Sequence, residues 1–408
     1  MNKKFIPYGS QFIDEDDIAA VSDALRSPFL TTGPLADEFE KKLSEYLGVK
    51  YAVLCANGTA ALHLSMMSLN IGKGDSVITS PITFVADANA PRFCGADVLF
   101  ADIDPETINL DPNKVRKILE NNKSVKAIIP VHFAGQAADM ESFSALAKEF
   151  NVHIIEDGCH ALGGGYLKEG KEVKVGSCSD SKMTTFSFHP IKSITTGEGG
   201  AITTNDESLY RKLKILRSHG NTRDPSEVVY KDLAFSKTNQ GEIFNPWYYE
   251  LQHLSFNYRL TDFQAALGMS QLSKLDMFIE KRNSLSKHYD KVISSLGDSR
   301  IEPLKTVQGK NHARHLYVIK IPMKNLEGGR AGLMNELLQA GIQTQVHYIP
   351  INWQPYYQEY FKEKISFPEA ESYYLDCLSL PMHVPMSNED VERVIEETSL
   401  ILNKLWMD

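Results

Sequence analysis

One lysine stands in a segment whose composition could support chemistry. Lys192 belongs to the stretch TTFSFHPIKSITTGEGGAITTN, in which an apolar run leads into a short polar loop and then into Gly197, Gly199 and Gly200. A partly desolvated lysine keeps its amine neutral often enough to attack a carbonyl group. An isolated lysine is far more often a solvated surface residue. The glycines permit close approach of the backbone to a ligand, and Ser187 offers a hydroxyl to a phosphate, so the segment favours a cofactor-binding loop.

Two further polar residues follow another apolar run, VHIIED. Asp157 ends this run, and His160 comes three positions later. An aspartate after a strand is commonly a helix N-cap or a solvated residue, and a histidine is as readily buried and hydrogen bonded. Because the Lys192 segment follows later in the chain, a role in a binding site is the favoured interpretation of Asp157. For His160 both interpretations stay open.

The segment NGTAALHLSMM places four residues at the start of a predicted helix: Asn57, Gly58, Thr59 and Ala60. Free backbone N–H groups and the positive end of the helix dipole make such a position a natural phosphate site. Ordinary capping of the helix by Asn57 or Thr59 is the alternative. The motif alone does not distinguish between the two.

Seven short apolar runs supply the elements that must position these residues. They alternate with amphipathic helical patterns between about residues 50 and 205, as YAVLCA, SVITS, VLFADI, KAIIPVHF, VHIIED, TTFSF and GAITTN. Such alternation predicts an α/β protein with a mostly parallel central sheet covered by helices. Ligands of such sheets bind beyond the carboxyl ends of the strands. We therefore expect a site assembled from four strand ends: residues 57–60, Thr83 and Phe84, residues 157–160 and residues 187–192.

The second half of the chain predicts a second, smaller domain. Residues 225–249 are polar and aromatic without a sustained period, which indicates a long excursion, and residues 259–296 indicate a long connecting helical stretch. HLYVIKIP and QTQVHYIP are strand candidates, and a closing helix is expected from Ser387, where Asp390 completes a capping arrangement. We expect a large α/β domain over residues 1–250, with an N-terminal arm over residues 1–20, and an α+β domain over residues 251–408 that includes the connecting helix.

Composition limits the class of protein and its partners. The chain has 408 residues, of which 42% are hydrophobic and 23% charged, as in soluble globular proteins. The formal net charge of -9 works against binding to nucleic acid, which depends on basic residues. Neither a secretory signal nor an apolar stretch of membrane-spanning length is evident, and the five scattered cysteines contain no C-x-x-C pair that would suggest a metal site. We expect a cytoplasmic protein with reduced cysteines, no bound metal and no membrane partner.

Several ordered motifs resemble those of one enzyme family. They run nearly from end to end of the chain, as TTGPLADEFEKKLSEYLG, NGTAALHL, ITFVADANA, PVHFAGQAADM, IIEDGCHALGGGY, SFHPIKSITTGEGG, FNYRLTDFQAALG, HLYVIKIP and LSLPMH. Their order and spacing resemble the sugar aminotransferases of the DegT/DnrJ/EryC1/StrS family, which are pyridoxal-phosphate (PLP) enzymes of fold type I. The resemblance implies an aspartate aminotransferase-like fold, PLP as the cofactor of the large domain, and amino transfer to a keto sugar.

The resemblance also implies the roles of individual residues. Lys192 matches the Schiff-base lysine, at a position where some relatives have histidine and catalyse dehydration instead. Asp157 matches the aspartate that keeps the pyridine nitrogen protonated, and His160 would lie near the phenolic oxygen of the ring. Phe84 matches an aromatic residue that lies against the face of the cofactor, although an isolated phenylalanine belongs more often to the core.

The cofactor phosphate has its own set of implied partners: Gly58, Thr59, Ala60 and Ser187. Asn257 matches a residue that reaches the phosphate from the neighbouring subunit, which implies a homodimer with shared active sites. This chain has Ser255 and Phe256 where the family has Gly and Tyr, so the resemblance does not fix the local path of the backbone here.

Three segments resemble most the family members of the pseudaminic-acid pathway: IPYGSQFI, PWYYELQHL and VHYIPINWQPYY. That branch implies transfer of an amino group from L-glutamate to the C4 ketone of a UDP-linked 4-keto-6-deoxy-N-acetylhexosamine. The candidate substrate-binding residues are Tyr8, Thr31, Thr32, His347 and Tyr348. Two alternatives are another nucleotide-linked 3- or 4-keto sugar as the acceptor, and a non-catalytic regulator that binds PLP or a sugar nucleotide. The chain has no basic or helix-turn-helix appendage that would favour a DNA-binding regulator.

Overall fold

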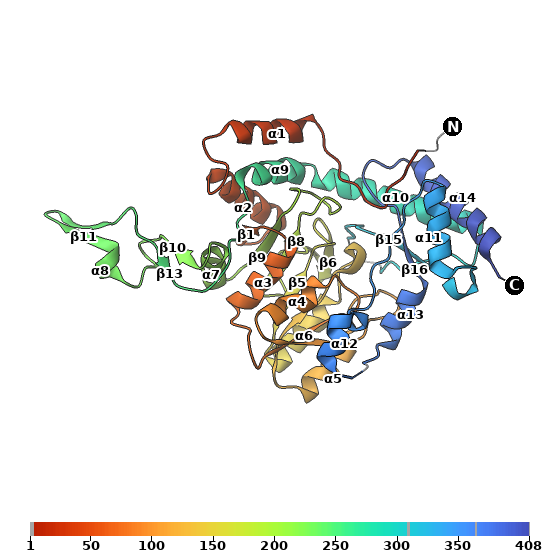
Figure 1. Cartoon of the computed structure of the whole chain (residues 1–408), viewed down its shortest axis with the longest axis horizontal. Coiled ribbons are helices and arrows are strands. Elements are labelled where there is room, and N and C mark those ends of the chain that lie inside the picture. Colours follow the sequence, from red (N-terminus) through yellow and green to blue (C-terminus); the bar gives the residue numbers. More distant parts are fainter. Residues whose placement is uncertain (1–3, 308–310, 364, 408) are drawn as a thin grey trace.

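A seven-stranded sheet forms the centre of the protein (Figure 1). The computed structural model describes residues 4–307, 311–363 and 365–407. The strands lie in the order β1, β9, β8, β5, β4, β2 and β3, with the bounds β1 (Tyr51–Cys55), β2 (Ser76–Thr79), β3 (Asp97–Phe100), β4 (Val125–Ile129), β5 (His153–Asp157), β8 (Met183–Ser187) and β9 (Gly200–Thr204). β9 runs antiparallel to both of its neighbours, and the other six strands share one direction. The prediction of a mostly parallel sheet from the seven apolar runs is confirmed.

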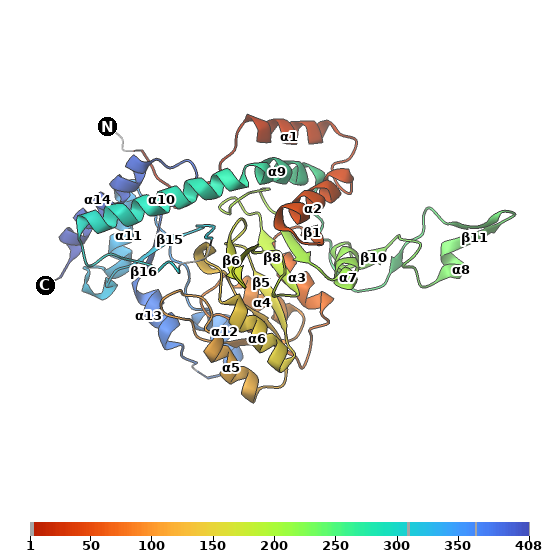
Figure 2. The ribbon, with the colours of Figure 1, turned by 180° about the vertical axis from the view of Figure 1, so that it is seen from behind.

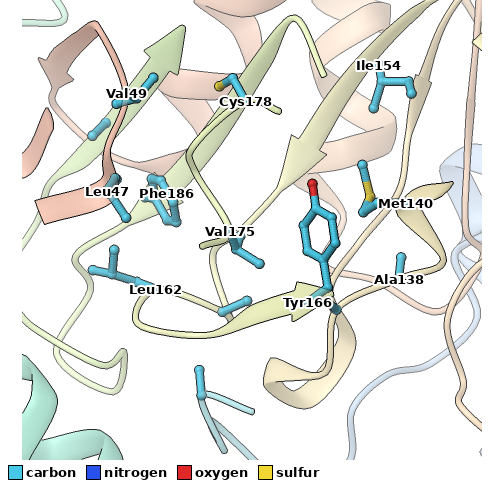
Figure 3. Close-up of a cluster of buried hydrophobic side chains, with 14 of the residues drawn as sticks. Leu47, Val49, Ala138, Met140, Ile154, Leu162, Tyr166, Val175, Cys178 and Phe186 are labelled. Atoms are coloured by element: carbon cyan, nitrogen blue, oxygen red, sulfur yellow. The ribbon is translucent and has the colours of Figure 1, made fainter. Parts of the chain in front are cut away.

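Both faces of this sheet are buried, which explains why its strands are almost uninterruptedly apolar. Successive residues of a strand point to opposite faces. Leu54 lies in one hydrophobic cluster together with Phe186, whereas Val53 and Ile155 lie in another. Figure 3 shows part of the first cluster, in which Leu47 lies next to Phe186.

Helices cover the two faces of the sheet. The cluster that contains Leu54 includes residues of α2 (Pro34–Leu47), α5 (Pro112–Asn121), α6 (Met140–Phe150) and α9 (Asp262–Ser273). The cluster that contains Val53 includes residues of α3 (Gly58–Ser68), α4 (Ala86–Phe93) and α7 (Glu207–Arg217). A hairpin of β6 (Gly165–Lys168) and β7 (Lys171–Lys174) follows β5. Removing apolar surface from water on both faces stabilises the frame that carries the strand ends.

The C-terminal part is built on a helical stretch and a small sheet. The predicted connecting stretch is confirmed as α9 and α10 (Leu275–Leu296), which meet at Lys274. The other elements are β14 (Glu302–Pro303), β15 (Tyr317–Lys320), α11 (Gly329–Gln339), α12 (Pro355–Phe361), α13 (Pro368–Asp376), β16 (Cys377–Leu380) and α14 (Asn388–Leu405). The predicted cap of α14 is confirmed, because the Ser387 hydroxyl accepts from the Asp390 N–H at 3.2 Å and the Asp390 carboxylate accepts from the Ser387 N–H at 3.0 Å.

The strand predicted for QTQVHYIP is wrong. Residues 343–350 make no regular strand, and Gln345 forms one isolated bridge to Ser379. The reason is a tertiary contact just beyond this bridge: the His347 carbonyl accepts from the Tyr373 hydroxyl at 2.7 Å instead of from a neighbouring strand. The segment therefore meets the outer edge of β16 and continues as irregular chain, which carries His347 and Tyr348 toward the large sheet.

The predicted excursion over residues 225–249 is confirmed, but it is not irregular throughout. It contains α8 (Lys231–Ala234) and a hairpin of β11 (Phe235–Thr238) and β12 (Gly241–Phe244). At its base β10 (Asn221–Thr222) pairs with β13 (Glu250–Leu251). Both views show the hairpin projecting from the body of the protein (Figures 1 and 2).

The buried core continues into the C-terminal part. A further cluster combines Ile6 with residues between Leu285 and Leu405, and another joins Phe133 of the first half to Tyr373 of the second. α9 packs against α1 (Glu15–Arg26) and α2, whereas α10 packs against α14. The domain boundary near residue 250 stays a prediction, and residues 1–3 of the expected arm lie outside the described residues. Within the described ranges, no helix combines the length and apolar character needed to cross a membrane.

Close contact between α9 and α2 generates a prediction about stability. A Cβ at Gly268 would lie 2.2 Å from Cε1 of Phe39, a fully buried ring. We expect Gly268→Ala to lower the free energy of unfolding by about 1–3 kcal/mol, because overpacking forces neighbours from their positions. Urea unfolding measures the loss. If the Phe39 ring is the cause, Gly268→Ala/Phe39→Leu loses less than the sum of the single variants; strictly additive losses would contradict the explanation.

Candidate active site

Strand ends that are distant in the sequence meet at one edge of the sheet. A Cβ at Gly58 would lie 3.0 Å from Cβ of Ser187 and 3.4 Å from Sγ of Cys159. A Cβ at Gly200 would lie 2.5 Å from the carbonyl carbon and oxygen of Asn57. Position 200 therefore requires glycine, because a Cβ would clash with backbone, and at position 58 a Cβ would press against the Ser187 side chain.

The start of α3 leaves backbone donors available at this edge. The Asn57 side chain accepts from the Ala60 N–H at 2.8 Å, so capping by Asn57 is confirmed. The first helical bond runs from the Ala61 N–H to the Asn57 carbonyl at 3.1 Å. The N–H groups of Gly58 and Thr59 precede this bond and stay outside the helical ladder. Capping and anion binding are thus compatible, since they use different groups of the same helix terminus.

Lys192 lies in the loop that joins β8 to β9. The loop is closed by the Phe188 N–H, which donates to the Gly199 carbonyl at 2.8 Å, and the Lys192 N–H donates to the His189 carbonyl at 2.8 Å. Part of the residue is accessible, but burial of its amine lowers the pKa of Lys192 below the ordinary value, while nearby acidic groups oppose the shift: Cys159, Asp157 and Asp87. The alternative of a solvated surface lysine does not describe this amine.

Two carboxyl groups meet beside Lys192. Asp157 ends β5, is 7% exposed, and accepts from the Cys159 N–H at 2.9 Å. Asp87 of α4 is 1% exposed; the Thr83 hydroxyl donates to it at 2.5 Å, and the Asp157 carboxyl group lies within hydrogen-bonding reach of it. Burial, followed by the charge of Asp157, raises the pKa of Asp87 well above its ordinary value. Sequence reasoning missed Asp87, although a carboxylate inside the apolar motif ITFVADANA was a usable signal.

His160 is buried beside a second histidine. Its ring centroid lies 4.4 Å from that of His315, and its Nε2 lies 3.1 Å from the Tyr348 hydroxyl. Its Nδ1 has no hydrogen-bond partner within the described part of the chain. Burial and then the charge of Lys192 hold the pKa of His160 well below its ordinary value, so the ring is neutral. His160 is buried, but only half of its hydrogen-bonding capacity is used.

Three aromatic candidates continue the site from His160. Phe84 is 57% exposed and its ring centroid lies 6.4 Å from that of Tyr348, so a core role for Phe84 is wrong. The ring centroids of Tyr8 and His347 lie 6.0 Å apart. The Nδ1 of His347 lies 2.8 Å from the Ser379 hydroxyl, and burial lowers the pKa of His347 to about 3. These side chains reach the strand ends from three separate parts of the chain.

The remaining candidates, Thr31, Thr32 and Asn257, lie at or near a crevice on the surface. Thr31 forms an isolated bridge to Thr261. Thr32 lines a crevice of about 910 Å³, in which six basic residues outnumber three acidic ones: Arg211, Lys214, Arg217, His219, Arg223 and Arg259 against Glu207, Asp224 and Glu227. Asn257 is exposed and forms a bridge to Ser218, which lines the same crevice. The structure thus groups the predicted residues into two sets, one around Lys192 and one around this basic crevice.

The first set fits the cofactor that the resemblance implies. The free N–H groups of Gly58 and Thr59, with the Ser187 hydroxyl beside them, suit a phosphate. A buried carboxylate at Asp157 suits a protonated ring nitrogen, and the desolvated amine of Lys192 suits attachment to an aldehyde. The individual roles of these residues stay predictions.

The lowered pKa of Lys192 predicts how stability depends on pH. Because its folded pKa lies below the ordinary value of 10.5, the unfolded chain binds more protons between these two values, and stability rises with pH across that window. In cofactor-free protein, Lys192→Met should therefore be more stable than the native chain at neutral pH, with an advantage that shrinks as the pH approaches 10.5. Urea unfolding at several pH values measures this. Lys73→Met, at an exposed position, is the control, and parallel curves for the native chain and Lys192→Met would contradict the prediction.

Comparison with known proteins agrees with this geometry. A profile of the DegT/DnrJ/EryC1/StrS aminotransferase family matches residues 11–399. A Campylobacter jejuni protein named UDP-4-amino-4,6-dideoxy-N-acetyl-beta-L-altrosamine transaminase is 39% identical over 401 residues, which cover 98% of each chain.

Solved structures extend the likeness to the fold and the cofactor. Helicobacter pylori PseC, described as an aminotransferase involved in the biosynthesis of pseudoaminic acid, has a TM-score of 0.86 and 31% identity, over 98% of this chain and 100% of that chain. The PLP-form of the sugar aminotransferase Spr1654 from Streptococcus pneumoniae has a TM-score of 0.84 and 28% identity, over 98% and 99% of the two chains. The expected fold and PLP as cofactor are confirmed. The chain belongs to the DegT/DnrJ/EryC1/StrS aminotransferase family and is a PLP-dependent nucleotide-sugar aminotransferase.

Proposed function

We propose that this enzyme transfers an amino group from L-glutamate to the C4 ketone of a UDP-linked 4-keto-6-deoxy-N-acetylhexosamine and so forms UDP-4-amino-4,6-dideoxy-N-acetyl-beta-L-altrosamine. The observation that carries the chemistry is the desolvated Lys192 amine beside the buried Asp157 carboxylate. The choice of acceptor is supported by the name of the C. jejuni relative, which aligns over 98% of this chain.

Each residue around Lys192 has a proposed task. Bound PLP supplies the electron sink that accepts the electron pair left when a proton leaves the carbon beside the amine. Asp157 holds the proton on the ring nitrogen. The neutral Nζ of Lys192 takes the proton from the substrate carbon in one half-reaction and returns it in the other. Neutral His160 orients the Tyr348 hydroxyl, which lies 3.1 Å from its Nε2. Burial of these two side chains keeps water from the reacting atoms.

The acceptor sugar is proposed to enter beside Tyr8, His347 and Tyr348. Their rings contact one another or lie against His160, and His347, whose pKa burial lowers, is near enough to Lys192 for the lysine charge to lower that pKa further. A polar aromatic wall of this kind suits a sugar ring, whose faces are apolar and whose edges carry hydroxyl groups.

The basic crevice around Thr32 is proposed to bind the nucleotide diphosphate. Arg223 and Arg259 line it, and the Nε of Arg259 is buried without a hydrogen-bond partner within the described ranges. Guanidinium groups recognise phosphate oxygens through paired hydrogen bonds. Because the crevice also adjoins exposed Asn257, we propose that it completes the active site of a second subunit.

Exposed apolar residues around the hairpin support a homodimer. The side chains concerned are Val229 (70% exposed), Tyr230 (67%), Leu233 (65%), Trp247 (73%) and Leu254 (90%). Monomeric soluble proteins rarely expose so many large apolar groups on one segment. A second copy of the chain is therefore the proposed cover. The proposed compartment is the cytoplasm, since all five cysteines are free thiols.

A substrate assay tests the proposed reaction. Purified enzyme should show the absorbance band of lysine-bound PLP, lose it on addition of glutamate, and then convert the UDP-linked 4-keto sugar to an amino sugar detected by mass spectrometry. Lys192→Ala should lack both the band and the product, because the amine proposed to bind the cofactor and to carry the proton is removed. A TDP-linked or 3-keto sugar that is consumed faster than the proposed acceptor would favour the first alternative. A protein that binds PLP without forming any amino sugar would favour the regulator.

Sharing of the active site predicts complementation between two defective variants. Lys192→Ala and Asn257→Ala should each be inactive or nearly so as pure dimers. If Asn257 serves the site of the other subunit, mixed dimers contain one intact site, and unfolding and refolding the mixture should restore about a quarter of the native activity. If both residues serve the same subunit's site, every site in the mixture keeps a defect and no activity returns. Native mass spectrometry of the refolded protein confirms that mixed dimers form.

A further inference from the structure

The carboxyl group of Asp87 has no place in the chemistry described so far. It lies on the first turn of α4, is 1% exposed, and accepts a hydrogen bond from the Thr83 hydroxyl through Oδ2. Its other oxygen, Oδ1, is buried and finds no ordinary donor among the described residues. A buried acceptor without a donor is costly, so the position needs an explanation.

Asp157 supplies that explanation. The Asp157 carboxyl group lies within hydrogen-bonding reach of Asp87, although two ionised carboxylates have no proton to share. Two buried carboxyl groups within hydrogen-bond reach therefore hold one proton between them. Asp157 already accepts from the Cys159 N–H and faces the cofactor site, so its carboxylate is the better acceptor. The proton accordingly belongs to Asp87.

We propose that Asp87 is a positioning residue that donates this proton as a hydrogen bond to the Asp157 carboxylate. In that state the two groups carry a single negative charge, which matches the single positive charge of a protonated ring nitrogen. The hydrogen bond from Asp87 and the bond from the Cys159 N–H hold the Asp157 carboxylate in one orientation. The inference rests on the proposed role of Asp157 and adds a second residue that acts through it.

Charged and titratable groups from several elements face this pair. Cys159 comes from the end of β5, Lys192 from the loop after β8, and Tyr348 from the C-terminal segment. The charge of Lys192 favours ionisation of Asp87, but burial and the charge of Asp157 outweigh it. Tyr348 stays a neutral hydroxyl, because burial raises its pKa well above the ordinary value.

Two variants at position 87 separate a hydrogen-bond donor from a carboxylate. Asp87→Asn keeps a neutral donor of nearly the same shape, whereas Asp87→Leu keeps the size but no donor. The probe is pyridoxamine phosphate, which forms no covalent link to Lys192, and its dissociation constant for full-length cofactor-free protein is measured by fluorescence. We expect Asp87→Asn to bind within about threefold of the native protein and Asp87→Leu to bind about tenfold more weakly or worse, since hydrogen bonds to charged groups are the stronger kind.

A double-variant cycle shows whether Asp87 acts through Asp157. In an Asp157→Asn background, Asp87→Leu should weaken binding of pyridoxamine phosphate by no more than about twofold further, because the carboxylate that it orients is gone. A full tenfold loss in that background would show a packing effect and overturn the proposal. So would native affinity in Asp87→Leu, or a loss in Asp87→Asn equal to that in Asp87→Leu.

A second measurement needs neither cofactor nor substrate. The raised pKa of Asp87 means that the folded chain binds more protons than the unfolded chain between pH 3.8 and the folded pKa. This contribution to stability is fully present below pH 3.8 and is lost as the pH rises through the folded pKa. In Asp87→Asn the free energy of unfolding should no longer lose this contribution as the pH rises. A pH profile of stability identical to that of the native protein would overturn the proposal. Failure of the sugar assay with these results intact would count against the proposed acceptor alone.

Discussion

A lysine amine becomes a nucleophile and a carrier of protons only where water is kept from it, because the solvated ammonium group is stably charged at neutral pH. In this protein burial outweighs the opposing effect of the groups around Asp157, and the net effect is a lowered pKa for Lys192. The sheet serves this condition directly. β5 and β8 are hydrogen-bonded neighbours, so the end of one strand and the loop after the other hold Asp157 and Lys192 on a single rigid frame.

Close approach of backbones is the second requirement of the site. The antiparallel strand β9 brings Gly200 against the carbonyl of Asn57, and the start of α3 brings Gly58 against Ser187. A Cβ at Gly200 would clash with the backbone of Asn57 and Gly58, and a Cβ at Gly58 would press against Ser187. Glycine loses more conformational entropy on folding than other residues, which costs stability. At these positions it allows the close backbone approach that forms a phosphate-sized site at the helix terminus.

Contacts between the two halves of the chain complete the site. Tyr373 packs against Phe133, and its hydroxyl donates to the His347 carbonyl at 2.7 Å. This contact holds the irregular segment whose Tyr348 hydroxyl lies against His160. Phe133 and Tyr373 thus share one buried cluster, against which Tyr348 packs, and this cluster joins the two halves of the chain beside His160. The exposed hairpin and the basic crevice lie apart from this junction, as groups that serve a neighbouring subunit would.

Features that depend on near neighbours in the chain were predictable from residue types alone. The seven strands, the start of α3 and the Ser387 cap of α14 are of this kind, because hydrophobic period and capping act over a few residues. The resemblance of the motifs to one family also predicted PLP as the cofactor and amino transfer as the reaction. Tertiary structure decided the rest. Residues 343–350 make only one bridge to β16 because the His347 carbonyl bonds the Tyr373 hydroxyl instead, and Asp87 lies near Asp157 because the order β2, β4, β5 brings two distant carboxyl groups together. Neither outcome is encoded locally, since both depend on which segments become neighbours when loops of different length close.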